Sequence, residues 1–134
     1  MKEYNRRQFI ATASVLAAAP AIIGQSENKN STQLIHHVFF WLKNPDSVED
    51  KHKLLAGLEK LTAVKTIRDY QIGLPADTSR GVIDRSYSVS WLLVFANAAD
   101  QDSYQVDPLH LKFVEECSSL WNKVVVYDTL TNHT

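Results

Sequence analysis

Large apolar side chains occupy every second position between residues 86 and 95, and this alternation constrains the fold more than any other sequence feature. They are Tyr87, Val89, Trp91, Leu93 and Phe95, and serines separate the first of them. Successive side chains of a β-strand point to opposite faces of a sheet, so a period of two is typical of a strand that buries one face. The chain is therefore expected to form a sheet with one packed side.

Three further segments have the composition of strands. Residues 34–42 are rich in β-branched and aromatic side chains and end before Pro45. Residues 66–74 alternate imperfectly before Pro75, and residues 123–130 include a run of valines. Proline ends a strand because it cannot donate a ladder hydrogen bond. Residues 76–84 carry turn-forming side chains and are expected to form a surface loop.

Apolar residues at helical spacing lie between these strands. Asp46 or Ser47 offers an N-cap for a helix that runs to about Leu61, and residues 100–106 indicate a short helix. Proline favours the first turn of a helix, so a second long helix is expected from Pro108. Its apolar positions are Leu111, Val114, Cys117 and Leu120 or Trp121. The order β-α-β-β-α-β predicts an α+β, ferredoxin-like fold with two helices on one face of a four-stranded antiparallel sheet.

The second face of such a sheet has no helices to cover it. The residues assigned to this face are Val38, Phe40, Tyr87, Val89, Trp91 and Phe95. Left in water, they would form a larger apolar patch than monomers usually tolerate. A second copy of the chain is therefore expected to cover them, so that two protomers form a dimeric α/β barrel.

The first 24 residues have the pattern of an export signal. Basic residues at positions 2, 6 and 7 precede an uncharged apolar run over 9–23, and Arg6-Arg7-Gln8-Phe9-Ile10 resembles a twin-arginine motif. The small residues at 19–21 offer a cleavage site. An N-terminal core helix or an uncleaved membrane anchor is the alternative interpretation, but the run is short for a span of about 20 residues.

This interpretation divides the chain into four parts. Residues 1–24 are the twin-arginine-type signal, 25–33 a polar linker, 34–130 the folded domain and 131–134 a tail. After removal of the signal, the chain is expected to be periplasmic or extracellular and to have no stable membrane span.

Charge and motifs exclude several classes of function. The 134 residues carry a formal net charge of −1, and loss of the basic signal makes the remainder more acidic, which disfavours nucleic-acid binding. A glycine-rich phosphate loop, a GxSxG elbow and a zinc signature are all missing from the sequence. The single cysteine, Cys117, cannot form an intrachain disulfide and is expected to be a small buried side chain.

Three segments resemble the stress-responsive dimeric α/β-barrel (Dabb) family. They are residues 35–43, 102–113 and 123–128, and the most distinctive pattern runs through Tyr104, Pro108, His110 and Phe113. The resemblance covers residues 34–130 and implies the same element order and a homodimeric barrel. The family includes plant polyketide cyclases, which close a ring by an intramolecular aldol reaction in the cavity of each protomer.

The resemblance also implies roles for individual residues. His110 corresponds to the general base of the cyclases, Tyr104 to the tyrosine that orients the substrate oxygen, and His36 to the histidine of the first strand. An imidazole can accept a carbon-bound proton near neutral pH, and a phenol can hydrogen-bond a developing enolate. Two polar pocket positions of the cyclases are apolar in this chain, at Leu58 and Val89.

Each histidine and the tyrosine also have a structural interpretation. His110 could donate to a carbonyl near the helix start, and Tyr104 could simply cover the cavity. His36 and His37 are expected to point to opposite faces, one toward the dimer seam or cavity and the other toward the helices. These residues with His52 lack the paired spacing typical of zinc ligands, so no metal site is predicted.

Three functions remain open at this stage. The first is an exported protein that binds a small apolar or aromatic molecule in the barrel cavity without changing it. The second is a lyase or cyclase-type enzyme that uses His110 as base with Tyr104 and His36, and the third is a haem-handling or oxygenase protein with a histidine ligand, by fold analogy alone. No cofactor is predicted. The expected ligand-binding residues are Val38, Phe40, Leu58, Val89, Trp91 and Phe113.

Overall fold

A computed structural model describes residues 32–132 of the chain. The predicted export signal and nearly all of the predicted linker lie outside these residues. The described elements are β1 (Leu34–Leu42), α3 (Val48–Leu61), β2 (Ile67–Gly73), β3 (Val89–Phe95), α4 (Ala98–Gln105), α5 (Pro108–Cys117), a 3₁₀ turn (Ser118–Leu120) and β4 (Trp121–Leu130).

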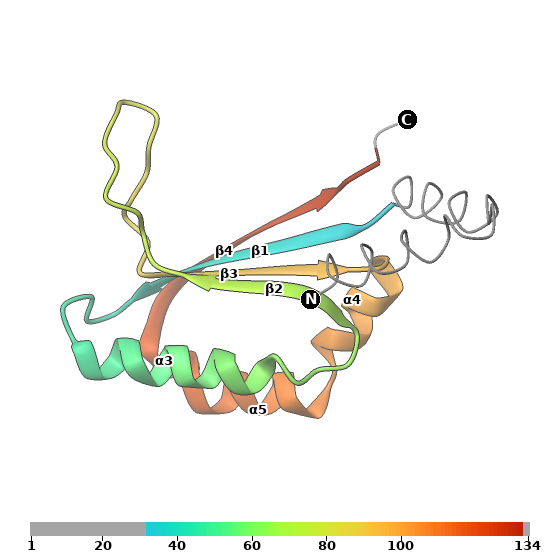
Figure 1. Ribbon diagram of the computed structural model, residues 1–134. Coiled ribbons are helices and arrows are strands. Elements are labelled where there is room, and N and C mark those ends of the chain that lie inside the picture. Colours follow the sequence, from blue (N-terminus) through green and yellow to red (C-terminus); the bar gives the residue numbers. More distant parts are fainter. Residues whose placement is uncertain (1–31, 133–134) are drawn as a thin grey trace, which may run out of the picture. The chain divides into compact units, whose positions relative to one another are not determined.

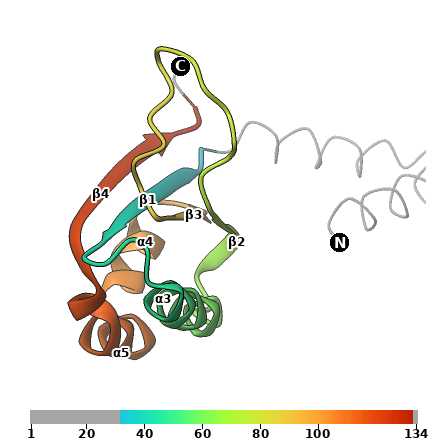
Figure 2. The ribbon, with the colours of Figure 1, turned by 90° about the vertical axis from the view of Figure 1, so that its left-hand side faces the viewer.

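The four strands form one sheet in the order β2-β3-β1-β4, and all neighbouring strands are antiparallel. The helices all lie on the same side of this sheet (Figure 1), and the view turned by 90° shows α3 and α5 side by side beneath it (Figure 2). The predicted α+β, ferredoxin-like fold is confirmed. The short helix α4 joins the two expected helices on the covered face.

Local caps explain where the helices begin. The Ser47 side chain accepts a hydrogen bond from the backbone N–H of Asp50 and starts α3, and Asn97 caps α4 in the same way through Asp100. Asp107 accepts from the backbone N–H of Leu109 and starts α5, with Pro108 in the first turn. These side chains satisfy backbone donors that the first helical turn leaves free.

The helix-covered face of the sheet corrects one sequence-based assignment. In β1 the buried side chains are those of Leu34, His36, Val38, Phe40 and Leu42, and in β3 they are those of Val89, Trp91, Leu93 and Phe95. The expectation that Val38, Phe40, Val89, Trp91 and Phe95 lie on the open face is wrong, because their faces carry the helices. The alternation predicts which side chains share a face of the strand, but it does not indicate which of the two faces the helices cover.

Tyr87 departs from the predicted alternation. The strand begins at Val89 rather than at residue 86, so the period of two does not extend back to Tyr87. Its ring packs on Phe39, with centroids 4.9 Å apart, on the opposite face of the sheet from Trp91.

The open face carries its own set of half-buried residues. The register pairs His37 with Leu92 and with Tyr127, so these three side chains share the face that has no helices. The Phe39 ring packs beside that of His37, with the centroids 4.2 Å apart, and the Lys123 ammonium lies 4.4 Å from the centroid of the Trp41 ring. An aromatic cluster therefore stands where the sheet has no helical cover.

Close packing joins the two long helices. A Cβ atom added at Gly57 of α3 would lie 2.7 Å from the Sγ atom of Cys117 in α5. The buried side of α5 consists of Phe113 and Cys117, whereas Leu111 is 56% exposed. Cys117 is buried as predicted, whereas two other apolar positions of this helix, Leu111 and Val114, are exposed. The buried side of α5 thus packs against Gly57 of α3.

Hydrogen bonding between β1 and β4 continues one residue beyond the ends of the two strands. Gln33 and Thr131 exchange two hydrogen bonds, one from the Gln33 N–H to the Thr131 hydroxyl and one from the Thr131 N–H to the Gln33 carbonyl. The first residue of β4 is Trp121, whereas the sequence predicted that this strand begins at residue 123. Among the described residues, no helix is long and apolar enough to cross a membrane.

The loop between β2 and β3 projects to the side opposite the helices (Figure 1). At its base, the Trp41 indole N–H donates to the Ser86 hydroxyl at 3.0 Å, and the Leu42 N–H donates to the Ser88 hydroxyl at 3.1 Å. The loop is therefore anchored to the end of β1.

Candidate functional site

The sheet contributes a histidine and a carboxylate to the candidate site. His36 is buried in β1, and its Nδ1 atom lies 2.6 Å from Oδ1 of Asp128, its direct partner in the β1–β4 register. Directly opposed residues of paired strands share a face, so the register itself creates this pair. A carboxylate accepts hydrogen bonds, so Nδ1 carries the proton and, in the neutral imidazole, Nε2 is an acceptor.

The tyrosine of the site comes from α4 and is held by the sheet. Tyr104 is 2% exposed, and the indole N–H of Trp91 in β3 donates to its hydroxyl oxygen at 3.1 Å. Burial raises the pKa of Tyr104 to about 12, since the phenolate is poorly solvated there, while the hydrogen bond from Trp91 acts in the opposite direction. The phenol is therefore protonated at neutral pH.

The second histidine comes from the first turn of α5. The Nδ1 atom of His110 lies 3.1 Å from the backbone carbonyl oxygen of Gln105, and a carbonyl can only accept, so Nδ1 is the donor. Burial lowers the pKa of His110, and the nearby His36 adds to this effect. The Gln105 carbonyl and the Asp107 carboxylate raise it, but less. The imidazole is therefore neutral near pH 7, with the lone pair of Nε2 unoccupied by this bond.

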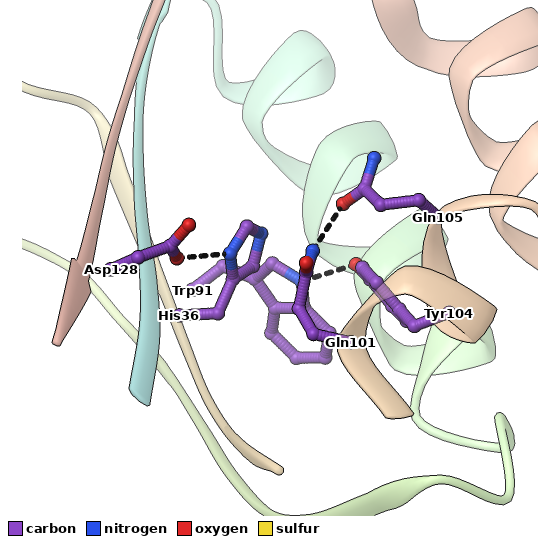
Figure 3. A network of polar contacts seen from close by, with 6 residues as sticks. All are labelled: His36, Trp91, Gln101, Tyr104, Gln105 and Asp128. Carbon is purple, nitrogen blue, oxygen red and sulfur yellow. Dashed lines mark hydrogen bonds and ion pairs between the residues drawn. The ribbon is translucent and has the colours of Figure 1, made fainter. Parts of the chain in front are cut away.

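The three rings lie together on the helix-covered side of the sheet. The ring centroid of Tyr104 is 4.7 Å from that of His110 and 6.0 Å from that of His36. Figure 3 shows the His36 imidazole between Asp128 on one side and the side chains of α4 on the other. The structure thus brings together the three residues proposed from the sequence, from elements separated by most of the folded chain. A neutral imidazole acceptor on His110 and a phenol donor on Tyr104 at this spacing can transfer protons.

Sequence reasoning did not identify Asp128 or the role of Trp91 as a hydrogen-bond donor. Asp128 follows a run of valines at the edge of the sheet, and its side chain is 49% exposed. Only the strand register, which the sequence does not give, places it beside His36. On the same side of α4, Gln101 donates to the side-chain oxygen of Gln105 at 2.8 Å (Figure 3).

The six expected ligand-binding residues all lie in the hydrophobic core. They are Val38, Phe40, Leu58, Val89, Trp91 and Phe113, and each is buried. One of them, Phe113, contacts a histidine of the site, with its ring centroid 6.4 Å from that of His110. Phe40 and Trp121 pack on Phe113, so an aromatic wall adjoins the polar centre.

His37 does not take part in this site. It lies on the opposite face of β1, where its Nε2 atom is 2.9 Å from the Ser90 hydroxyl, and burial lowers its pKa. The expected division of the two adjacent histidines between the two faces is confirmed. Within residues 32–132, no group of three or more His, Cys, Asp or Glu residues is arranged to hold a metal ion.

Several solved structures share this fold. A dimeric protein of unknown function from Bacteroides fragilis is 18% identical, with a TM-score of 0.58 over 72% of this chain and 94% of the other. A Dabb family protein from Mesorhizobium loti is 22% identical, with a TM-score of 0.61 over 73% and 95%. A hydroxynitrile lyase from Passiflora edulis is 23% identical, with a TM-score of 0.62 over 76% and 95%. These likenesses show the fold alone.

The fold and the site define a ferredoxin-like protein with a histidine and tyrosine centre between sheet and helices. The family model of the stress responsive A/B barrel domain matches residues 34–130, which is most of the chain and all of the sheet. The chain therefore belongs to the stress-responsive A/B barrel domain (Dabb) family. No curated protein matches the chain.

The state of His110 can be tested by following the Cε1–H resonances of the histidines by NMR as the pH is varied. Because burial dominates, His110 is expected to titrate below 6.5, the ordinary value for histidine. Asp107→Asn keeps a helix-capping side chain but removes a negative charge that favours the imidazolium, so it should lower the midpoint further. A midpoint at or above 6.5, or a rise in Asp107→Asn, would contradict this account.

Proposed function

We propose that the chain binds a small, uncharged molecule with a carbonyl oxygen on an apolar or aromatic body, and that the site moves a proton on this molecule. The supporting observation is the way in which both imidazoles are held. Asp128 and the Gln105 carbonyl each occupy an Nδ1 atom, so both Nε2 atoms are acceptors when the rings are neutral. This arrangement suits acid–base chemistry of the lyase or cyclase type.

In the proposed reaction, His110 is the general base. Its neutral Nε2 takes a proton from the carbon next to the carbonyl group, and the electron pair of that C–H bond moves to the carbonyl oxygen as an enolate. The Tyr104 hydroxyl donates a hydrogen bond to this oxygen, where charge develops. The enolate carbon then attacks a second carbonyl carbon of the molecule, a carbon–carbon bond forms as that C=O π bond opens, and His110 returns the proton to the resulting alkoxide oxygen. His36, fixed by Asp128, orients the bound molecule.

Binding without reaction is the simpler alternative, and the aromatic wall supports it. Phe113, with Phe40 and Trp121 packed on it, offers apolar contact beside His110 whether or not a proton moves. A hydroxynitrile lyase from Passiflora edulis has this fold, but its sequence identity of 23% is too low to assign its reaction to this chain. A haem-handling role has no supporting observation among the described residues and stays an untested prediction.

Exchange of carbon-bound hydrogen for deuterium tests proton transfer without knowledge of the natural substrate. Acetophenone and phenylacetaldehyde are incubated with the protein in D₂O, and loss of the proton signal next to the carbonyl is followed by NMR. The wild-type protein should accelerate exchange, and the catalysed exchange rate should fall by about 10²–10⁴-fold in His110→Gln. His52→Gln, an exposed change on α3, is the matched control and should exchange at the wild-type rate.

Ligand-observed NMR on the same samples separates the two readings. Binding of the aromatic probes without accelerated exchange would contradict the acid–base proposal and favour a binding protein. Exchange that is equally fast in His110→Gln would show that another group is the base.

The same proposal includes a homodimer joined through the open face of the sheet. The aromatic cluster of His37, Phe39 and Tyr127 lies there without helical cover, and Tyr127 is 63% exposed. Burial of such a face against a second copy removes apolar surface from water. Structures from Bacteroides fragilis and Thermobifida fusca with this fold are described as dimeric, which supports the proposal.

Sedimentation velocity tests this assembly. The wild-type protein should sediment with twice the protomer mass at micromolar concentration, and Leu92→Glu or Tyr127→Glu on the open face should shift it toward the monomer. Leu111→Glu, an equally drastic change on the exposed side of α5, should leave the dimer intact. A wild-type monomer, or a dimer that both open-face variants retain, would contradict this interface.

The proposal places the mature protein outside the cytoplasm, on the basis of the twin-arginine-type pattern at residues 6–10. Replacement of both Arg6 and Arg7 by lysine preserves charge but removes the arginine pair, and it should abolish export, as measured by fractionation and immunoblotting. Lys2→Arg changes a basic residue outside the pair and serves as the control. Export that survives the double replacement would contradict the twin-arginine assignment.

A further inference from the structure

The hydrogen bond between Trp91 and Tyr104 has a fixed direction. An indole nitrogen carries one hydrogen and can only donate, so the Tyr104 oxygen must be the acceptor at 3.1 Å. Trp91 is 1% exposed and Tyr104 is 2% exposed, so water does not compete for this bond. The hydroxyl hydrogen of Tyr104 is consequently not used in it.

The geometry of a phenol then restricts where this hydrogen lies. The O–H bond of a phenol prefers the plane of its ring, which leaves two positions on either side of the C–O axis. The indole N–H approaches the oxygen from one side, and the hydroxyl hydrogen avoids that side because two hydrogens would meet there. Among the described residues, no second hydrogen bond is recorded for this oxygen. Its proton therefore has no hydrogen-bond partner within the described residues.

We propose that Trp91 is a positioning residue, which holds the Tyr104 oxygen as an acceptor and so presents the phenol proton to the ligand. The inference rests on the proposed function, in which Tyr104 donates to a developing oxyanion. It adds a residue from the centre of the sheet to the site and gives it a role through its N–H group rather than through apolar contact. The same N–H stabilises the tyrosine oxygen as negative charge builds on it during proton donation.

Two opposing effects act on the phenol. Burial raises the pKa of Tyr104 and the indole hydrogen bond lowers it. Loss of the indole N–H should therefore raise the pKa of the phenol by about one unit, the size expected for one hydrogen bond to the charged form. If Trp91 served only to fill space, replacing it by a side chain of the same shape without the N–H group would leave the pKa of Tyr104 unchanged.

The test uses a titration that needs no substrate. Incorporation of 3,5-difluorotyrosine at position 104 brings the phenol into an accessible pH range, and its ¹⁹F resonance reports ionisation. Replacement of Trp91 by β-(3-benzothienyl)alanine keeps the shape of the indole and removes its N–H, and Trp91→Phe is the encoded counterpart. Both should raise the midpoint by about one pH unit relative to the protein with Trp91.

Trp41 provides the matched control. Its indole N–H also donates to a side-chain oxygen, that of Ser86 at 3.0 Å, but on the open face of the sheet. Replacement of Trp41 by the same isostere should leave the Tyr104 midpoint unchanged. An unchanged or lowered midpoint with the isostere at Trp91 would overturn the inference, and a fold check by ¹H–¹⁵N NMR accompanies each variant.

A rate measurement links the inference to the proposed function. The isostere at Trp91 should slow deuterium exchange into the carbonyl probes, and it should slow it no further once Tyr104→Phe has removed the phenol. If the midpoint moves but the wild-type protein catalyses no exchange, the proposed reaction fails while the indole's control of the phenol stands. If exchange occurs and the midpoint does not move, the role of Trp91 fails and the acid–base function stands.

Discussion

The pleat of β1 is the constraint on which the other features depend. Because adjacent side chains of a strand point to opposite faces, His36 faces the helices and His37 faces the open side of the sheet. β1 is a central strand, with β3 on one side and β4 on the other. The residues paired with it in both neighbouring strands therefore alternate between the same two faces. The polar centre and the aromatic cluster are thus two faces of one strand, and a change of register in β1 would exchange them.

Polar groups are unusual in a core of this size, and their partners explain how they are accommodated. His36, Tyr104 and Trp91 are almost completely buried, and each has a hydrogen bond to a defined partner. A buried polar group without a partner costs about 1–3 kcal/mol, so removal of one member of the network leaves the other in an unfavourable position. The hydrogen bond that each ring makes to its partner fixes the orientation of that ring.

The sequence was sufficient for the fold but only partly for the site. Local patterns predicted the strand and helix order, a cap at Asp46 or Ser47 and the burial of Cys117, because each depends on neighbours in the chain, and the structure has the cap at Ser47. The face of the sheet that the helices cover was assigned wrongly, since the period of a strand is the same for either choice. Asp128 and the donor role of Trp91 were missed because they arise from strand register and from packing across the sheet. The resemblance to a family indicated His36, Tyr104 and His110, and the structure adds the groups that orient them.

The pair formed by His36 and Asp128 joins the first and last strands of the sheet, across 92 positions of the chain. A contact at such a separation closes a long loop, and the entropy of that closure must be offset by the strand ladder before the carboxylate reaches its histidine. The imidazole of β1 is made early in synthesis and remains without its carboxylate until the end of the chain has paired. The chemistry of the site is therefore tied to completion of the fold, and partly assembled chains would carry the histidines without the means to orient the first of them.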